Sequence, residues 1–517
     1  MADGSDPGSY DELTYESGGL PRTINWWGAF VIGLAGTILV TGIAPVMVTS
    51  LGAAAVPIIF IVTVSGYLLC LFLAELSAMM PDRSGGSPAY AYPAYKDRWP
   101  RFAEHVNGFT AWAYWLGWFP VAPLNMILAS FYIVDRFKLS TAGFTPIHTP
   151  IAWWTLGISV VGILLLFVPA YLGLRFGTVF ATTLAMLSMI PLTFLAISWI
   201  FHPSVVDFGQ LFHFRHVDGS GFFASQFKHG WLTLSIAFSF LLTWNVIAME
   251  AAACYIGETR DPDRDAKIAM NLEGAYGVFI YVMIPVAFII VLGNKALGNV
   301  ALVDPKTIFV HFASRVFGSG TGSSLLNWLI AVMLIIALVL SALNAITGTA
   351  RSLHQMSVDG QFPHFFQHTN SHGVPDHSMI FNVTCSIVVV FFGGAVEIYT
   401  FSNVGYLASF IPVLIGYYLL RKHRPNLRRP FRLPEWMKYV ALAIAALYAV
   451  IYFWGGPVYA SCSCSQAGHS TLPYYFIGFG VLAAYYPLYL WRKAGDRRKV
   501  DGLGAGTELP SGGAAGP

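Results

Sequence analysis

Long apolar runs recur along this chain and are separated by short polar segments. Each run is about 20 residues long, which is the length that an α-helix needs to cross the hydrocarbon core of a bilayer. We count twelve predicted spans, which begin near Trp26, Ala53, Val106, Ile151, Thr178, Leu232, Ile268, Leu325, Ser378, Ile398, Tyr439 and Leu472. The pattern therefore predicts an all-α polytopic membrane protein embedded in a lipid bilayer.

The two ends of the chain differ from this pattern. Acidic residues precede the first span, a glycine-rich segment follows Val500, and neither end has enough apolar side chains to form a core. The first span also lacks the short core and the small-residue cleavage site of a signal peptide. We expect disordered tails at residues 1–24 and 494–517.

Composition and charge agree with a membrane protein and predict its orientation. Hydrophobic residues make up 56% of the chain, charged residues make up 11%, and the mean hydropathy is +0.61. If the N-terminus is inside, the outer loops hold only seven of the 29 Lys and Arg residues, namely Arg136, Lys138, Arg215, Lys228, Lys295, Lys306 and Arg315. The positive-inside rule then places both termini in the cytoplasm and the protein in the plasma or inner membrane. The net charge of +3 is spread over loop ends, so we expect no nucleic-acid partner.

Two spans carry residues that interrupt a helix. The first span contains Gly28, Gly33, Gly36, Gly42 and Pro45. We expect a break there near Thr41 to Ala44. The sixth span is interrupted by Asn245, Glu250 and Gly257. Since these spans come first in two halves of five spans each, the pattern is typical of transporters with inverted repeats, whose substrate site lies between two broken helices. Glycines that only allow close helix packing are the alternative explanation.

Glu250 is a carboxylate within a segment that is apolar enough to cross the bilayer. An ionised side chain at that depth costs about 3 kcal/mol on insertion scales, so it needs a partner, a proton or a water-filled cavity. Three roles stay open for Glu250. It can carry a coupling proton, bind a cationic amine, or hold the broken helix to a neighbour by hydrogen bonds.

Several motifs resemble those of the amino acid, polyamine and organocation transporters. The segment 74–90 is similar to the family's Ala-Glu-Leu, Pro, Ser-Gly-Gly and Tyr signature after the second span. Glu250, Glu258 and Pro262 resemble the pattern after the sixth span, with Asp261 in place of the usual Asn. The segments that begin at Arg351 and Arg428 resemble the inner segments after the eighth span and before the eleventh.

The resemblance covers residues 24–492 and implies the LeuT-type fold. That fold has two inverted repeats of five helices plus two peripheral helices, and it moves small molecules by alternating access. The repeats would occupy residues 25–203 and 204–421, and the peripheral spans residues 422–493.

The resemblance also implies a substrate site near the middle of the membrane. Backbone N–H groups at Thr41, Gly42 and Ile43 would hold an anionic group at the start of a half-helix. Thr37, one turn earlier, can bond either a ligand or its own helix. The other residues expected to line the site are Gly117 on the third span and Trp244, Asn245 and Ala248 on the sixth, with Trp244 in the position of the family's gating aromatic.

Four further residues bear on ion coupling. The family's proton-dependent members often carry a Lys in the fifth span at the position of Ser188 in this chain. Ser341 and Asn344 in the eighth span, with Thr347, can either form a sodium site or bond neighbouring helices. We favour a proton, or exchange of substrates, over sodium.

Other classes of protein receive little support from the sequence. His364, His368 and His372 are spaced for a metal, but Gly373 and Pro375 break the helix that would align them, so we expect neither a metal nor a cofactor. The chain has no phosphate-binding loop, so energy must come from gradients. We predict a secondary active transporter of amino acids or related amines and not an enzyme. A sodium-coupled or inorganic-cation transporter of the same fold is the alternative, and a membrane enzyme or receptor is the rival from another class.

Overall fold

The structure of the 517-residue chain is a computed structural model. It describes residues 19–96, 99–146, 149–213, 231–318, 323–461 and 470–505. Within these ranges the regular structure is almost entirely helical, as the hydropathy pattern predicts. The exception is one two-stranded antiparallel sheet, in which β1 (Gly143–Phe144) pairs with β2 (Ile151–Ala152).

The first half of the chain contains eight α-helices. They are α1 (Trp26–Gly33), α2 (Val40–Leu51), α3 (Ala55–Met79), α4 (Ala91–Lys96), α5 (Pro100–Trp118), α6 (Val121–Arg136), α7 (Trp153–Tyr171) and α8 (Leu174–Ile197). Short 3₁₀ segments join them, of which η1 (Thr37–Leu39) and η3 (Ser87–Tyr90) lie near the interrupted helices.

The second half begins with α9 (Trp231–Ile247), which continues into an 11-residue 3₁₀ segment, η7 (Ala248–Glu258). It then comprises α10 (Pro262–Leu292), α11 (Asn294–Leu297), α12 (Pro305–Phe317), α13 (Ser323–Val358), α14 (Asp376–Val390) and α15 (Ala395–His423). The last helices are α16 (Met437–Val450), α17 (Gly456–Ser461), α18 (Leu472–Ala483) and α19 (Tyr485–Ala505).

Nine helices of the described ranges are long and apolar enough to cross a membrane. One of them, Trp26–Met79, is 54 residues long, more than twice what one pass needs, and it turns at Gly52, where φ is 55°. The helices α14, with 15 residues, and α18, with 12, are shorter than the roughly 20 residues that one pass needs. The chain is therefore a multi-pass membrane protein, and the expected twelve spans are consistent with this arrangement.

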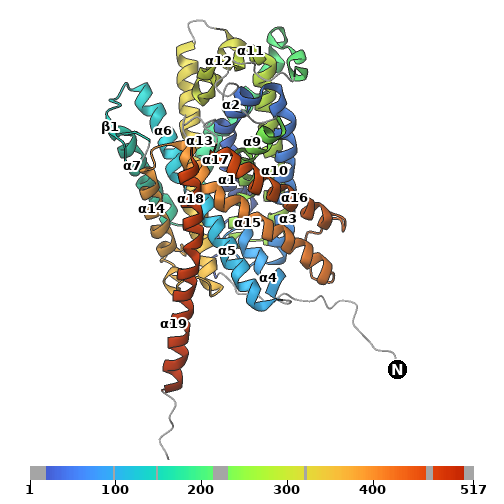
Figure 1. Ribbon diagram of the computed structural model, residues 1–517, viewed down its shortest axis with the longest axis vertical. Coiled ribbons are helices and arrows are strands. Elements are labelled where there is room, and N and C mark those ends of the chain that lie inside the picture. Colours follow the sequence, from blue (N-terminus) through green and yellow to red (C-terminus); the bar gives the residue numbers. More distant parts are fainter. Residues whose placement is uncertain are drawn as a thin grey trace, which may run out of the picture.

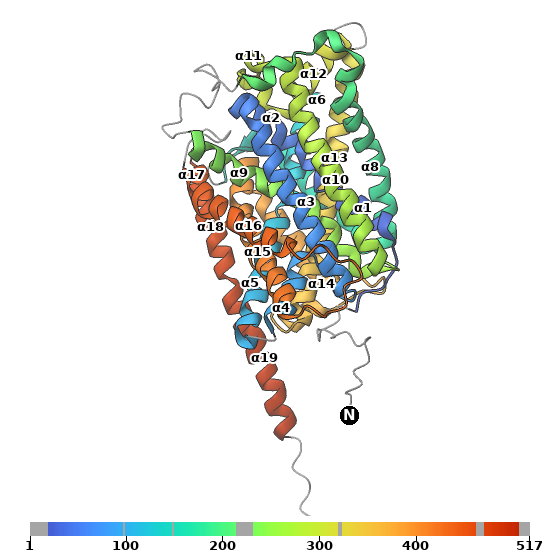
Figure 2. The same ribbon diagram turned by 90° about the vertical axis from the view of Figure 1, so that its right-hand side faces the viewer.

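The helices form one elongated bundle (Figures 1 and 2). The short helices α11 and α12 lie at one end, and α4 and α19 lie at the other (Figure 1). Following the predicted orientation, we call these the outer end and the inner end. Inside the bundle, α3 packs along α10, and α5 packs along α15. The two interrupted helices lie between these pairs, so every side of the interruption is surrounded by helices.

The first helix breaks earlier than the sequence suggests. Helix α1 ends at Gly33 and α2 begins at Val40, so the interruption lies at residues 34–39 and the expected break at Thr41 to Ala44 is wrong. Pro45 is accommodated inside α2. The break occurs instead where Gly36 meets the second interruption. A Cβ atom at Gly36 would lie 1.8 Å from the carbonyl oxygen of Ala248, so only glycine fits there.

The tails differ in part from expectation. Residues 494–505 continue α19, although the sequence predicts disorder from residue 494. Arg492 and Asp496, one helical turn apart, form an ion pair that supports this extension. At the other end, Thr23 and Ile24 bond to the carbonyl oxygen of Glu258, so this part of the expected tail is ordered. The remainder of both tails, 1–18 and 506–517, lies outside the described residues.

Candidate functional site

The two interruptions, residues 34–39 and the 3₁₀ segment η7, meet at the centre of the bundle, and we call their contact the junction. The 3₁₀ segment η7 follows α9 without a loop, and 3₁₀ runs longer than four residues are uncommon. Besides the contact of Gly36 with Ala248, a Cβ atom at Gly33 would lie 2.6 Å from the backbone nitrogen of Ala252. Broken helices expose backbone N–H and C=O groups that ligands can use. The structure therefore places two such breaks against each other, as the paired positions in the sequence suggest.

Glu250 is buried on η7 beside this junction. Its Oε1 atom accepts three hydrogen bonds: from the Tyr114 hydroxyl at 2.7 Å, from the Tyr406 hydroxyl at 3.2 Å and from Trp118 Nε1 at 3.3 Å. Tyr114 and Trp118 belong to α5, whereas Tyr406 belongs to α15. The carboxylate therefore ties η7 to two neighbouring helices.

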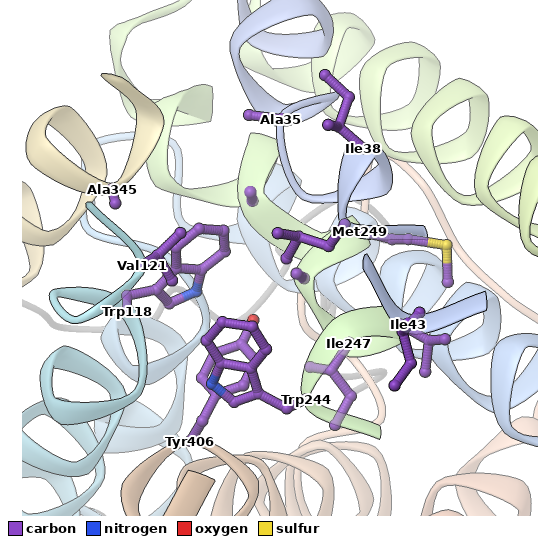
Figure 3. Packing of buried hydrophobic residues seen from close by; sticks show 14 of the residues in the cluster. Ala35, Ile38, Ile43, Trp118, Val121, Trp244, Ile247, Met249, Ala345 and Tyr406 are labelled. Atoms are coloured by element: carbon purple, nitrogen blue, oxygen red, sulfur yellow. The ribbon is translucent and has the colours of Figure 1, made fainter. Parts of the chain in front are cut away.

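Trp244 packs beside the residues bonded to Glu250, and we call the rings of Trp244, Tyr399 and Tyr406 the aromatic lid. Its Nε1 atom donates to the carbonyl oxygen of Gly117 at 3.2 Å. Its ring packs edge-on against Tyr399, with 4.8 Å between centroids, and against Tyr406, with 6.4 Å. Figure 3 shows Trp118, Trp244 and Tyr406 gathered around the end of α9. Gly117 has to be glycine, because a Cβ atom there would lie 2.3 Å from Tyr406 Cβ.

A cavity leads from the outer end toward this lid. It has a volume of about 640 Å³ and lies between α6, the start of α12 and the start of α15. A second cavity of about 60 Å³ shares four of its lining residues and reaches Gly42, Ile43 and Tyr399. Because Tyr399 contacts Trp244, the outer route ends on the aromatic lid.

Buried ion pairs lie on the inner side of the junction. Arg83 holds Asp359 through two hydrogen bonds, of 2.9 and 2.6 Å, and Asn107 donates to the same carboxylate at 3.0 Å. Arg351 pairs with Glu258 through both carboxylate oxygens. All four charged side chains are 2% exposed or less. The pairs connect the segment after α3, the end of η7 and the end of α13, so they close the inner side.

The predicted substrate residues lie on η1, α2, α5, α9 and η7. Thr37 is buried and its hydroxyl has no hydrogen-bond partner among the described residues, which leaves it available to a ligand. Thr41 instead bonds the carbonyl oxygen of Ile38 at 3.0 Å, and Asn245 Nδ2 bonds that of Leu241 at 2.9 Å. Thr41, Gly42 and Ile43 lie in the first turn of α2. The binding role of these residues stays a prediction.

Most of the residues predicted to act in ion coupling already bond other groups of the protein. Ser188 bonds the carbonyl oxygen of Leu184 in its own helix at 2.8 Å, and Thr347 bonds that of Leu343 at 2.7 Å. The side-chain oxygen of Asn344 accepts from the Tyr255 hydroxyl. Ser341 is buried, and its hydroxyl has no partner in the described part of the chain. Two of these four groups thus bond their own helices, and a third, Asn344, bonds Tyr255 on η7.

Sequence reasoning missed several residues of the site. Tyr399 and Tyr406 are seven residues apart on one helix, a spacing that places them on one face and could have marked them. Glu273 is a second buried acid, on α10, and an acid inside a predicted span is itself a signal. Nothing in the sequence indicates that Tyr114 contacts Glu250, because that contact depends on how distant helices pack.

The inner histidines gather differently from the spacing considered above. His368, Asp376 and His377 bring their ligand atoms within 4.8 Å of one another, while His364 contacts Asp496 at 2.7 Å. The rings of His368 and His377 stack with 4.3 Å between centroids and 17° between planes. Stacked rings direct their in-plane lone pairs side by side and not toward one point. This arrangement supports no metal site.

Comparison with known proteins agrees with this geometry. The family described as amino acid permease matches residues 24–482. A glutamate/γ-aminobutyrate antiporter of Lactococcus lactis is 26% identical over 39% of this chain and 41% of its own length, so less than half of that protein is matched. An uncharacterised amino acid permease of Bacillus subtilis is 23% identical over 76% of this chain and 83% of its own length. Because the family match spans most of the sequence and both interruptions, the chain belongs to the amino acid permease family.

Proposed function

We propose that this protein is a secondary active transporter that moves amino acids or related amines across the cell membrane by alternating access. The observation that carries the proposal is the junction itself. Two helix breaks meet beside a buried carboxylate, an aromatic lid closes them from an outer cavity, and buried ion pairs close them from the inner end. A site with one gate on each side is what alternating access requires.

An amino acid fits the chemistry of this junction. Its carboxylate can accept a hydrogen bond from the hydroxyl of Thr37, which has no partner among the described residues. Its ammonium group, or that of an amine, can lie against the rings of Trp244 and Tyr399. The similarity to an antiporter of glutamate and γ-aminobutyrate supports exchange as a possible mode.

Glu250 is proposed to act as a latch that a proton releases. All three groups bonded to Oε1 act as donors, so the arrangement favours an ionised acceptor. A proton on this carboxyl group weakens the bonds to α5 and α15 and frees η7 to move. Proton coupling has more support than sodium coupling, because the amide oxygen of Asn344 is already engaged by Tyr255.

Uptake into proteoliposomes tests the function. The purified protein is reconstituted and assayed with labelled neutral, acidic and basic amino acids, with γ-aminobutyrate and with potassium. Each substrate is tested with an imposed pH gradient, with a sodium gradient and with unlabelled substrate preloaded inside. Uptake of an amino acid or amine that responds to the pH gradient or to preloading is expected. Transport of potassium alone would contradict the proposal.

Glu250→Gln tests the latch. Glutamine can still accept from the tyrosines but cannot take up or release a proton, so substrate uptake should lose its response to the pH gradient. Glu435→Gln, which removes an acid between α15 and α16, is the matched control and should keep the response. A Glu250→Gln variant with unchanged transport and unchanged pH dependence would show that Glu250 carries no proton.

A further inference from the structure

Glu273 lies on α10, where the two interrupted helices meet. Its side chain is fully buried. The Oε2 atom accepts a hydrogen bond from the backbone N–H of Ala252 in η7, at 3.1 Å. A Cβ atom at Gly33 would lie 2.7 and 2.8 Å from the two carboxyl oxygens, so the group rests directly on the end of α1. Glu273 thus touches both breaks at once.

Within the part of the chain that the structure describes, the surroundings of Glu273 offer no compensating positive charge. The ionisable groups within electrostatic range are Glu250, Cys254 and Tyr255 on η7 and Cys70 on α3. None of these is cationic, and α1 presents only the backbone of Gly33. The Oε1 atom has no hydrogen-bond partner among the residues that the structure describes. Arg351 of α13 is already paired with Glu258 of η7.

This setting favours the neutral form of the carboxyl group. An unpaired carboxylate in a dry interior costs several kcal/mol, whereas a carboxylic acid avoids most of that cost. Glu250 is a neighbouring buried acid, and two negative charges at these positions would repel each other. The two acids differ in their donors, since Oε1 of Glu250 accepts three hydrogen bonds from side chains and Oε2 of Glu273 accepts one from the backbone. Each acid keeps one oxygen without a partner among the described residues.

We propose that Glu273 is a proton-binding site, separate from Glu250, that links the occupancy of a proton to the contact between the two interrupted helices. In the closed junction the proton resides on Oε1, while Oε2 accepts from Ala252. When α1 and η7 separate from α10 toward the inner end, water reaches the carboxyl group, the proton passes to water, and the carboxylate that remains is hydrated. Reclosure needs a new proton, because the dry site does not accept the charge.

The proposal rests on the proposed transport function and adds a second titrating group to it. One coupled proton can drive about tenfold accumulation of substrate for each unit of imposed pH gradient. Glu273→Gln is close in shape to the protonated acid and should keep the junction closed and folded. We expect this variant still to exchange internal for external substrate. Its accumulation under a gradient of one pH unit should be about tenfold lower than that of the wild type.

Three results of the transport assay separate the possible failures. If the wild type transports no substrate, the proposed function is wrong and this inference falls with it. If the wild type accumulates substrate in response to pH and Glu273→Gln does so equally well, only the assignment of Glu273 is wrong. If Glu273→Gln instead loses a response to a sodium gradient, the site binds sodium and the proton assignment is overturned.

A measurement on the wild type covers the case in which the variant does not fold. Apolar carbodiimides form stable adducts with protonated carboxyl groups in membrane interiors and not with carboxylates. The protein in proteoliposomes is treated at pH 5 and pH 8, digested and analysed by mass spectrometry. An adduct on Glu273 at pH 8, when exposed acids such as Glu435 are unmodified, is the expected result. Absence of an adduct on Glu273 at both pH values would overturn the proposal.

Discussion

The outer and inner closures of the junction are built from different chemistry. The outer closure is a thin aromatic layer in which Trp244 contacts Tyr399 beneath a water-accessible cavity. The inner closure consists of two buried ion pairs that join three separate segments. Ring contacts are worth about 1 kcal/mol each, whereas breaking a buried ion pair costs about 3–5 kcal/mol. In the proposed alternating-access cycle, the outer closure is therefore expected to open more easily than the inner closure.

The largest expected effect comes from breaking the inner closure. Glu258→Gln leaves the buried guanidinium of Arg351 without its counter-ion, so we expect a loss of about 3–5 kcal/mol in stability. Thermal unfolding in detergent measures it. Combining Glu258→Gln with Arg351→Met should recover much of the loss, because no charge is then left unpaired. An unchanged unfolding temperature for Glu258→Gln alone would show that this pair does not stabilise the closed inner side.

A smaller effect is expected at the outer closure. Gly117→Ala would place a Cβ atom 2.3 Å from Tyr406, and the lid would have to shift to make room. Overpacking of this kind costs about 1–3 kcal/mol. We expect reduced substrate affinity together with lower thermal stability. Gly157→Ala on α7 is the matched control, since a Cβ atom there meets no other atom within 4 Å. Equal behaviour of the two variants would mean that the lid does not depend on this contact.

The smallest effect concerns a half-exposed contact beyond the last predicted span. Burial raises the pKa of Asp496, but hydrogen bonds from Arg492 and His364 outweigh it, and the net pKa is lowered. A lowered pKa in the folded state stabilises the protein above the unfolded-state pKa of about 3.9, and this stabilisation is lost as the pH falls further. Asp496→Asn should cost less than about 1 kcal/mol at pH 7.

The pH dependence of the unfolding temperature tests this explanation in the same variant. The unfolding temperatures of wild type and Asp496→Asn should converge as the pH is lowered from about 4. A difference that persists at low pH would place the effect in packing and not in charge. Glu258→Gln removes a buried ion pair of the inner closure, whereas Asp496→Asn removes a peripheral one. Comparing the two losses of stability therefore shows how much burial adds to an ion pair.

Much of the fold follows from the sequence, because helix-length apolar runs and breaker residues are local signals. The paired interruptions and the buried Glu250 are found in this way, and the gating role of Trp244 stays a prediction. The break position is not, since it depends on the fit of Gly36 against Ala248, more than 200 residues away. The donors to Glu250 come from α5 and α15 and are likewise set by tertiary packing. Glu273 carries a local signal of its own, because it is an acid within an apolar span.

The comparison of the two closures is tested most directly by measuring how well a thiol reagent reaches each closure during transport. In a background without cysteines, Ala395→Cys reports on the outer cavity and Ser84→Cys on the inner closure. A membrane-impermeant maleimide is applied to either face of proteoliposomes with and without saturating amino acid. We predict that Ala395→Cys is labelled without substrate, and that substrate protects it while labelling of Ser84→Cys increases. Labelling of both positions that does not respond to any transported substrate would contradict alternating access.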